Sequence, residues 1–97
     1  MISIPQPLDA AQLHAVIRLL ELRESDLALA TRQLDVLAQA RSLSAGQVKA
    51  IRMLLDLDDA EVDRALFNAC ADGESVELLL EHRAYVAHLH HLVGVDD

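Results

Sequence analysis

A short pattern of residues that starts α-helices recurs along this chain and constrains its fold more than any other feature. In the most complete form, Asp9 is placed to cap the first free N–H groups of a helix, and Gln12 can cap the backbone of Asp9 in return. Leu8 and Leu13 flank this pair and can pack against each other across the helix start. The same order of residue types returns, in decreasing agreement, at residues 43–48, 57–62, 71–76 and 22–27. Five such starts predict five short helices.

The spacing of the starts sets the expected helix limits, which are about 9–22, 25–41, 44–55, 58–71 and 74–92. Two limits stay open: Ser25 competes with Arg23 as the cap of the second helix, and Gly73 could end the fourth helix by adopting a positive φ. Apolar residues inside these limits recur at the spacing of a helix face and do not alternate as in a strand. The 19 Leu and 15 Ala among 97 residues also favour helix.

The predicted fold is therefore all-α, a compact bundle of about five short helices. We expect a single helical domain at residues 9–92, preceded by an extended lead-in at 1–8 and followed by a short acidic tail at 93–97. Several apolar side chains lie off the main helix faces, and a chain this small has difficulty burying them all. These are Leu19, Leu22, Leu29, Val36 and Phe67. They indicate an association surface, which we expect a second copy of the chain to cover in a homodimer.

The net charge of −8 is distributed unevenly. Residues 1–52 carry +1, whereas residues 53–97 carry −9. Part of the acidity has a structural explanation, because acids in the cap and first turn of a helix interact favourably with its dipole. The same acids form a surface that could dock on a basic partner protein. The candidate partner-binding residues are Asp56, Asp58, Asp59, Glu61, Asp63, Glu74 and Glu77.

No catalytic motif accompanies this surface, because the sequence contains no Gly-rich phosphate loop, nucleophile elbow or Cys-x-x-Cys. We therefore expect neither an enzyme nor a bound cofactor, but a small regulatory or adaptor protein that acts by protein–protein interaction. Its acidic surface would dock on or inhibit a basic partner, such as a nucleic-acid-binding protein. No stretch is apolar enough for a signal peptide or a membrane span, so we expect a cytoplasmic location and no membrane partner.

Residues 49–66 have the apolar spacing of a helix-turn-helix unit with a turn of two or three residues. Against this interpretation, Arg52 occupies the position of the small residue packed between the helices, and Asp56 occupies that of the turn glycine. The second helix would also carry acids toward DNA, which is the wrong sign for phosphate contacts. The alternative function is a helix-turn-helix-like DNA-binding transcriptional regulator that uses the basic residues of the first half. Its candidate DNA-binding residues are Arg32, Arg41, Lys49 and Arg52.

Four of the five histidines fall in the last predicted helix. His88 and His91 lie three residues apart and can face the same way, but zinc normally takes three or four protein ligands. They are weak candidates, and we expect no metal site. The single cysteine, Cys70, lies on a predicted buried stripe and is expected to be a small core residue.

Overall fold

The computed structural model describes the backbone of residues 4–92 and the side chains of residues 4–89. Five α-helices account for most of this part of the chain, which confirms the all-α prediction. They are α1 (Ala10–Arg23), α2 (Leu27–Gln39), α3 (Ala45–Leu54), α4 (Asp59–Ala69) and α5 (Gly73–Leu92). The tail expected at 93–97 lies outside the described residues.

The helix starts are set by the side chains of the recurring pattern. Asp9 and Gln12 form a reciprocal capping box at the start of α1, and Ser44 and Gln47 form another at the start of α3. At the start of α4, the Asp58 carboxylate accepts a backbone N–H of the first turn at 2.9 Å. These caps satisfy N–H groups that have no partner inside the helix.

Local hydrogen bonds settle the start of α2. Its cap is Asp26, whose carboxylate accepts the Leu29 N–H at 3.1 Å, so neither Arg23 nor Ser25 is the cap. The Ser25 hydroxyl instead donates to the Leu22 carbonyl at 3.2 Å, at the end of α1. Arg23 is the last residue of α1, and its side chain donates hydrogen bonds to the connection between α3 and α4.

The start of α5 is settled in the same way. Gly73 is the first residue of α5, so this glycine does not end α4. The residue before it, Asp72, accepts the Ser75 N–H at 2.9 Å. An aspartate cap and an acidic first turn, here with Glu74, are typical of a helix start.

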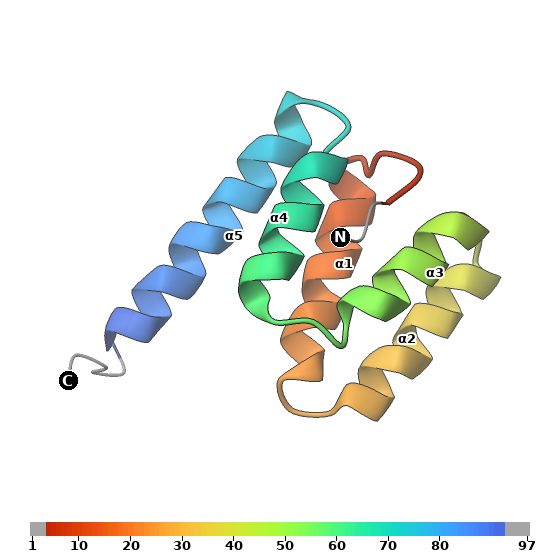
Figure 1. Ribbon diagram of the computed structural model, residues 1–97, viewed down its shortest axis with the longest axis horizontal. Helices are drawn as coiled ribbons and strands as arrows, with labels where there is room; N and C mark the ends of the chain where they lie inside the picture. Colours follow the sequence, from red (N-terminus) through yellow and green to blue (C-terminus); the bar gives the residue numbers. More distant parts are fainter. Residues whose placement is uncertain (1–3, 93–97) are drawn as a thin grey trace.

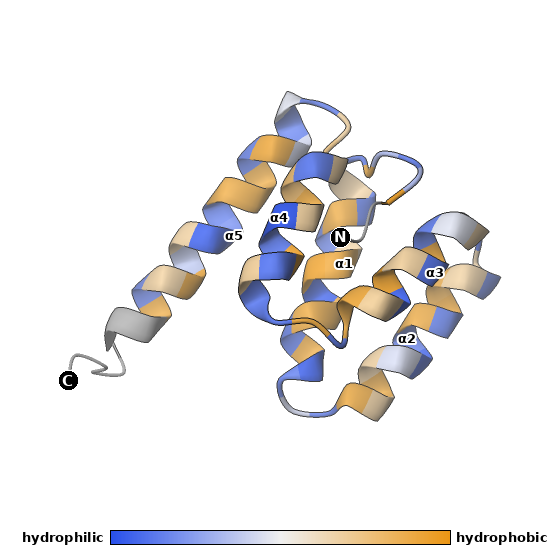
Figure 2. Cartoon of the chain, viewed as in Figure 1, coloured by the Kyte–Doolittle hydropathy of each residue, from blue (hydrophilic) through white to orange (hydrophobic). Residues whose placement is uncertain are grey.

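The central helix of the bundle is α1. It packs against α2 and α5, while α3 packs against α2 and α4 against α5 (Figure 1). All five helices carry apolar residues (Figure 2). The lead-in and every helix contribute fully buried side chains to one core, among them Leu8, Leu13, Leu34, Ile51, Leu54, Leu66 and Leu79.

The apolar side chains that lie off the main helix faces differ in their exposure. Leu19 is buried and Leu22 packs against the core, whereas Val36 and Phe67 are exposed. Leu29 is half-buried. The surplus apolar surface on α1 is therefore smaller than the sequence predicts, because other helices cover α1 on two sides.

Residues 4–8, expected as an extended lead-in, lie against the helices. Leu8 is fully buried, and its N–H donates to the Ala69 carbonyl at 2.7 Å. The Leu8 carbonyl accepts the Ala71 N–H at 2.9 Å and the Ser75 hydroxyl at 3.1 Å. This residue therefore joins the start of the chain to the connection between α4 and α5.

The buried Gln47 fixes the lead-in from the other side. Its side-chain amide donates to the carbonyls of Gln6 and Pro7 at 3.1 and 3.2 Å. The preceding residue is Gly46, where a Cβ would lie 2.9 Å from Cγ of Pro5. The lead-in can pass this close to α3 because Gly46 has no side chain.

The molecule measures 42 × 31 × 23 Å, with a radius of gyration of 13.3 Å. A compact domain of this length has a radius of gyration of about 13 Å. The long dimension includes α5, which continues past the other helices toward the C-terminus (Figure 1). None of the described helices combines the length and hydropathy needed to cross a membrane.

Candidate functional site

Two acidic loops lie at the same end of the molecule, although they are far apart in the sequence. One joins α1 to α2, and the other joins α3 to α4 (Figure 1). A shared hollow and a salt bridge between Arg23 and Asp59 connect them. We call this region, with the adjoining turns of α1 and α4, the acidic end. Its acidic residues are Glu21, Glu24, Asp26, Asp56, Asp58, Asp59, Glu61 and Asp63.

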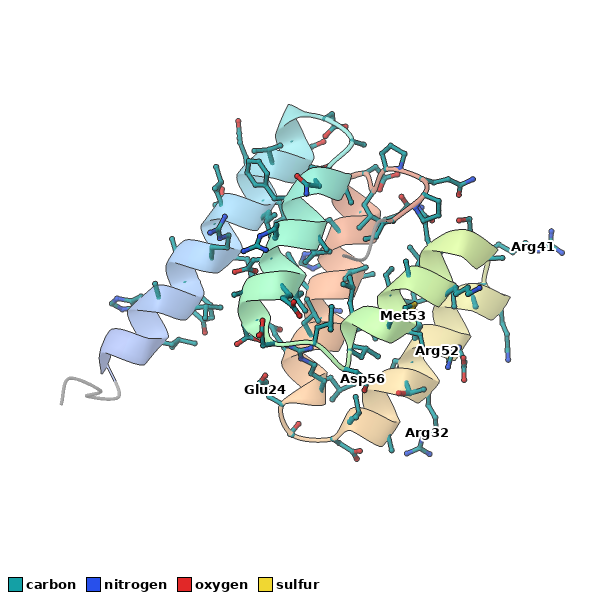
Figure 3. All side chains as sticks on the ribbon, viewed as in Figure 1. Glu24, Arg32, Arg41, Arg52, Met53 and Asp56 are labelled. Carbon is teal, nitrogen blue, oxygen red and sulfur yellow. The ribbon has the colours of Figure 1, made fainter. Side chains whose placement is uncertain are left out.

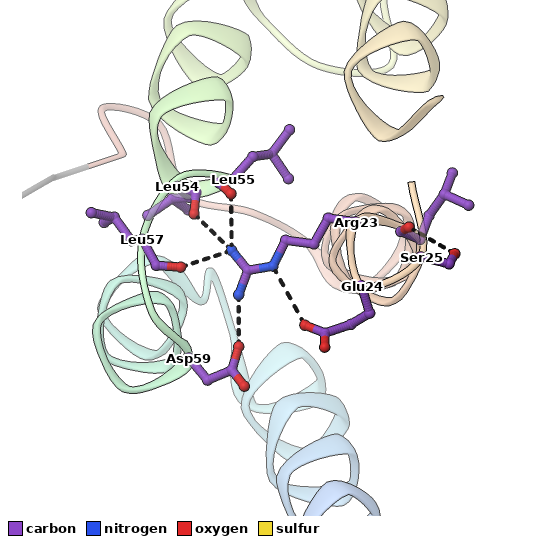
Figure 4. A network of polar contacts seen from close by, with 8 residues as sticks. Arg23, Glu24, Ser25, Leu54, Leu55, Leu57 and Asp59 are labelled. Carbon is purple, nitrogen blue, oxygen red and sulfur yellow. Dashed lines mark hydrogen bonds and ion pairs between the residues drawn. The ribbon is translucent and has the colours of Figure 1, made fainter. Parts of the chain in front are cut away.

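The Arg23 side chain holds the two loops of the acidic end together (Figure 4). Its guanidinium donates to the carbonyls of Leu54, Leu55 and Leu57 at 3.1, 3.3 and 2.9 Å. The same group donates to the Asp59 carboxylate at 2.6 Å. The Arg23 side chain is only 9% exposed. It therefore satisfies carbonyls at the C-terminal end of α3 that have no partner inside the helix.

A shallow hollow of about 460 Å³ lies between the two loops. Its apolar lining residues are Leu27, Leu55 and Leu57, of which Leu27 is exposed. Its acidic lining residues are Glu24, Asp56, Asp58 and Asp59. The hollow thus combines a small apolar contact with four carboxylates and Arg23.

The acidic residues of this end do not all have the same role. Asp58 caps α4, Asp59 pairs with Arg23, and Asp63 lies 3.6 Å from Nε of Arg83. The structural interpretation of the acidic run therefore holds for these three residues, and partner binding by the run stays a prediction. Among the described side chains of the acidic end, Glu21, Asp56 and Glu61 are exposed and neither cap a helix nor form an ion pair, so they are free to meet a partner.

The structure does not bring Glu74 and Glu77 to the acidic end. They lie in the first turns of α5, and α4 runs from the acidic end to the connection before α5 (Figure 1). The length of α4, 11 residues or about 16 Å, therefore separates them from Asp59. Beside them, hydrogen bonds from the Ser75 N–H and hydroxyl hold the pKa of Asp72 below its ordinary value.

The basic candidates all lie on the α2–α3 hairpin. Figure 3 shows Arg32 on α2, Arg41 in the connection and Arg52 on α3. Lys49 also lies on α3. All four are exposed. The positive charge of Arg52 is partly neutralised, because its guanidinium lies 2.7 Å from the Asp35 carboxylate.

Arg41 has an unfavourable backbone conformation for a side-chain-bearing residue. Its φ is 61°, which is the left-handed region where glycine is favoured. It directly follows the C-cap of α2, and the N–H of Ser42 donates back to the Leu37 carbonyl at 3.0 Å. Glycine is the usual residue at this position of a helix end, so arginine here lowers the stability of the fold.

The helix-turn-helix interpretation receives no decisive support from the geometry. The connection between α3 and α4 spans residues 55–58, which is longer than the predicted turn of two or three residues. The main packing partner of α3 is α2, and that of α4 is α5. A helix-turn-helix-like unit at residues 49–66 therefore stays a prediction.

The described side chains of the histidine and cysteine candidates lie in no metal-binding cluster. His88 is exposed, and the side chain of His91 lies outside the described part of the chain. Among the side chains that the structure describes, no three His, Cys, Asp or Glu residues are placed to hold a metal ion. Cys70 is half-buried, and its thiol donates to the Leu66 carbonyl at 3.3 Å. Burial raises the pKa of this thiol, and the nearby charge of Asp72 raises it further, which disfavours the reactive thiolate.

Sequence reasoning missed several residues of the acidic end. Glu21, Glu24 and Asp26 belong to the half of the chain that is neutral overall, so counting charge by halves concealed them. Leu27, which the expected helix limits place among the apolar residues of the second helix, is exposed. The one available signal was Arg23, a basic residue at a position where the recurring pattern requires a cap.

Comparison with protein-family models, with curated proteins and with solved structures gives no match to this chain.

Proposed function

We propose that this protein is a small, non-catalytic regulatory or adaptor protein that binds a basic partner protein at its acidic end. The observation that supports this most is the convergence of two acidic loops around the exposed Leu27. An apolar side chain among carboxylates offers a partner both apolar burial and charge complementarity. A cytoplasmic protein of this kind would inhibit a nucleic-acid-binding partner by covering the partner's basic surface.

The mutual repulsion of the acidic residues supports a partner of opposite charge. Like charges that are held close together reduce stability, and a bound cationic surface relieves that cost. Arg23 compensates only part of the charge, because it is used by the backbone carbonyls and Asp59. Asp56 and Glu61 therefore contribute charge without a structural role in capping or pairing.

Reversing the charge of two of the free acids, Asp56 and Glu61, is expected to abolish most partner binding. The variant Asp56→Lys with Glu61→Lys should capture partner protein about tenfold less well, because close charge pairs contribute at least this much at interfaces. Immobilised wild type and variant are incubated with lysate of the source organism, and captured proteins are quantified by mass spectrometry. Asp58 and Asp59 are left intact, because their replacement would also remove a helix cap and the Arg23 partner.

A matched control uses acids at the other end of α4. The variant Glu74→Lys with Glu77→Lys changes the net charge by the same amount and should retain capture. The proposal is wrong if both double variants lose capture equally, or if neither does.

A second candidate function is DNA binding by the α2–α3 hairpin, and the backbone of Arg41 is the observation that favours it. A non-glycine residue held in the left-handed region costs about 1 kcal/mol, and such strained residues often serve function. The long Arg41 side chain lies at the tip of the hairpin (Figure 3). Lys49 and the half-exposed Arg52 add further positive charge on the same hairpin.

This second function predicts binding to duplex DNA at low salt, with an affinity that falls steeply as salt increases. Combining Arg41→Gly with Lys49→Ala should abolish the mobility shift. Arg41→Gly alone should also raise the melting temperature, because glycine adopts a positive φ without strain. Arg18→Ala, on an exposed residue of α1, is the control that should leave binding unchanged. The absence of any shift for wild type at low salt would eliminate this candidate.

A further inference from the structure

A groove of about 550 Å³ lies beside the acidic end, between the C-terminal half of α5 and the facing parts of α1 and α4. Arg23, Glu24 and Asp59 line this groove and also line the hollow around Leu27. The groove and the hollow are therefore continuous, and the ion pair between Arg23 and Asp59 lies where they meet. A partner that covers the hollow has the groove directly beside its contact.

Apolar side chains run along the groove. Leu20 of α1 and Val62 of α4 line one side, and three residues of α5 line the other, namely Tyr85, Val86 and Leu89. These three residues have the spacing of one helix face, and we call them the α5 stripe. Tyr85 is 55% exposed and Leu89 is 41% exposed. The α5 stripe therefore leaves apolar surface that a partner can bury.

Acidic side chains flank the apolar residues on both sides of the groove. Glu21 and Glu24 lie in the last turn of α1 and directly after it. Among the described side chains, Glu21 is exposed and forms no ion pair, and the Glu24 side chain is 69% exposed, with a contact of 3.9 Å to Arg23. On α5, the exposed Glu81 lies one turn before Tyr85. Negative charge is therefore available on either side of the apolar residues.

The arginines of the groove are already paired within the chain. The Arg23 side chain is 9% exposed and donates to the Asp59 carboxylate at 2.6 Å. Nε of Arg83 lies 3.6 Å from the Asp63 carboxylate. Together with the two glutamates of α1, four acids and two arginines line the groove, which gives it a formal charge of −2. The side chains that line the groove therefore present free carboxylates to a partner, but no free guanidinium.

We propose that the basic partner binds this groove with an amphipathic helix that carries Lys or Arg on both sides of an apolar stripe. Its apolar residues, spaced three and four positions apart, pack against the α5 stripe and against Leu20 and Val62. Its cations face Glu21 and Glu24 on one side and Glu81 on the other. This inference rests on the proposed function, and it names the element of the partner that the acidic end and the groove receive together.

The charges disfavour a second copy of this chain as the occupant. Its α5 would bring another Glu81 beside the same acids, and its Arg83 is already paired with Asp63. A helix with the same apolar spacing but free cations gains both apolar burial and charge complementarity. The homodimer expected from the sequence stays a prediction, which the oligomeric state tests separately.

A model peptide tests the proposal without the partner. The probe is a fluorescein-labelled peptide of about 18 residues, or about five helical turns, made of Leu and Lys with the leucines on one face. Fluorescence anisotropy at physiological salt, where distant charges are screened, should show binding to wild type. Tyr85→Ser combined with Leu89→Ser should weaken binding about tenfold, because large side chains at the centre of an interface dominate affinity. Leu80→Ser is the matched control, because Leu80 is 48% exposed on the same helix but does not line the groove.

The charge requirement has its own matched variants. Glu21→Gln combined with Glu81→Gln should weaken peptide binding about tenfold. Glu74→Gln combined with Glu77→Gln removes the same charge from the start of α5 and should leave binding unchanged. A peptide of the same composition, with its leucines spread around the helix, should bind about tenfold more weakly than the amphipathic peptide. Circular dichroism confirms that each variant remains helical.

Three results would overturn the proposal. One is that wild type binds the amphipathic peptide no more tightly than the peptide with spread leucines, and another is equal weakening by Leu80→Ser. The third is a wild-type mass of twice 10.6 kDa by sedimentation equilibrium that falls to one chain in Tyr85→Ser with Leu89→Ser, since a second copy then occupies the groove.

Failure of this inference and failure of the proposed function give different results. If Asp56→Lys with Glu61→Lys lowers capture of the partner protein but Tyr85→Ser with Leu89→Ser does not, the proposed function stands and the helix inference is wrong. Peptide binding that depends on the α5 stripe, together with partner capture that neither variant changes, would contradict the proposed function instead.

Discussion

Replacing Arg23 with Ala is expected to lower the free energy of unfolding by about 3 kcal/mol. The Arg23 side chain is nearly buried and donates to three carbonyls at the end of α3 and in the turn that follows. Truncation leaves these carbonyls without a charged donor in a partly buried site. The ion pair itself adds little, because the Asp59 side chain is 69% exposed. Urea denaturation followed by circular dichroism measures the change.

Arg52 provides the matched control for Arg23. Its guanidinium also lies within 2.7 Å of a carboxylate, that of Asp35, but both side chains are about half exposed. Arg52→Ala should therefore lower the free energy of unfolding by less than about 1 kcal/mol. Arg23→Lys should fall in between, because a single ammonium group cannot reach all the acceptors of a guanidinium. A loss for Arg23→Ala no larger than that for Arg52→Ala would contradict the role given to Arg23.

Replacing Leu8 with Ala is also expected to cost about 3 kcal/mol, because truncation of a fully buried leucine removes apolar contacts and leaves a cavity. The site has little freedom to collapse around the smaller side chain. The Leu8 backbone is fixed by hydrogen bonds to Ala69 and Ala71, and Ser75 holds its carbonyl. The melting temperature and the urea midpoint should both fall.

The control for Leu8 is a leucine of equal size at an exposed position. Leu80→Ala on α5 should change the free energy of unfolding by less than about 0.5 kcal/mol. Similar small effects of Leu8→Ala and Leu80→Ala would show that the lead-in does not belong to the core.

The helix starts could be predicted because they depend on residues three positions apart. Asp9 with Gln12 and Ser44 with Gln47 form the expected capping boxes. The same local reasoning failed at α2, where several polar residues in a row could each act as the cap. Only the backbone path, which brings the Leu29 N–H to Asp26, selects one of them.

The candidate site could be predicted only in part, because it depends on contacts between distant segments. The sequence indicated an acidic region at residues 56–63, and the structure places this region at one end of the bundle. It did not indicate that the turn containing Glu24 lies beside Asp56 in the same hollow. Arg23 and Asp59 are 36 positions apart, so neither spacing nor periodicity could pair them.

The hydrogen bonds of Arg23 also bear on how a partner would bind. They join the end of α1 to the turn after α3, so the loops on either side of the hollow are held in one arrangement before binding. Loops that are already ordered lose little conformational entropy when a ligand arrives. A partner would therefore meet a preorganised surface, and most of the ordering on binding would fall on the partner's own segment.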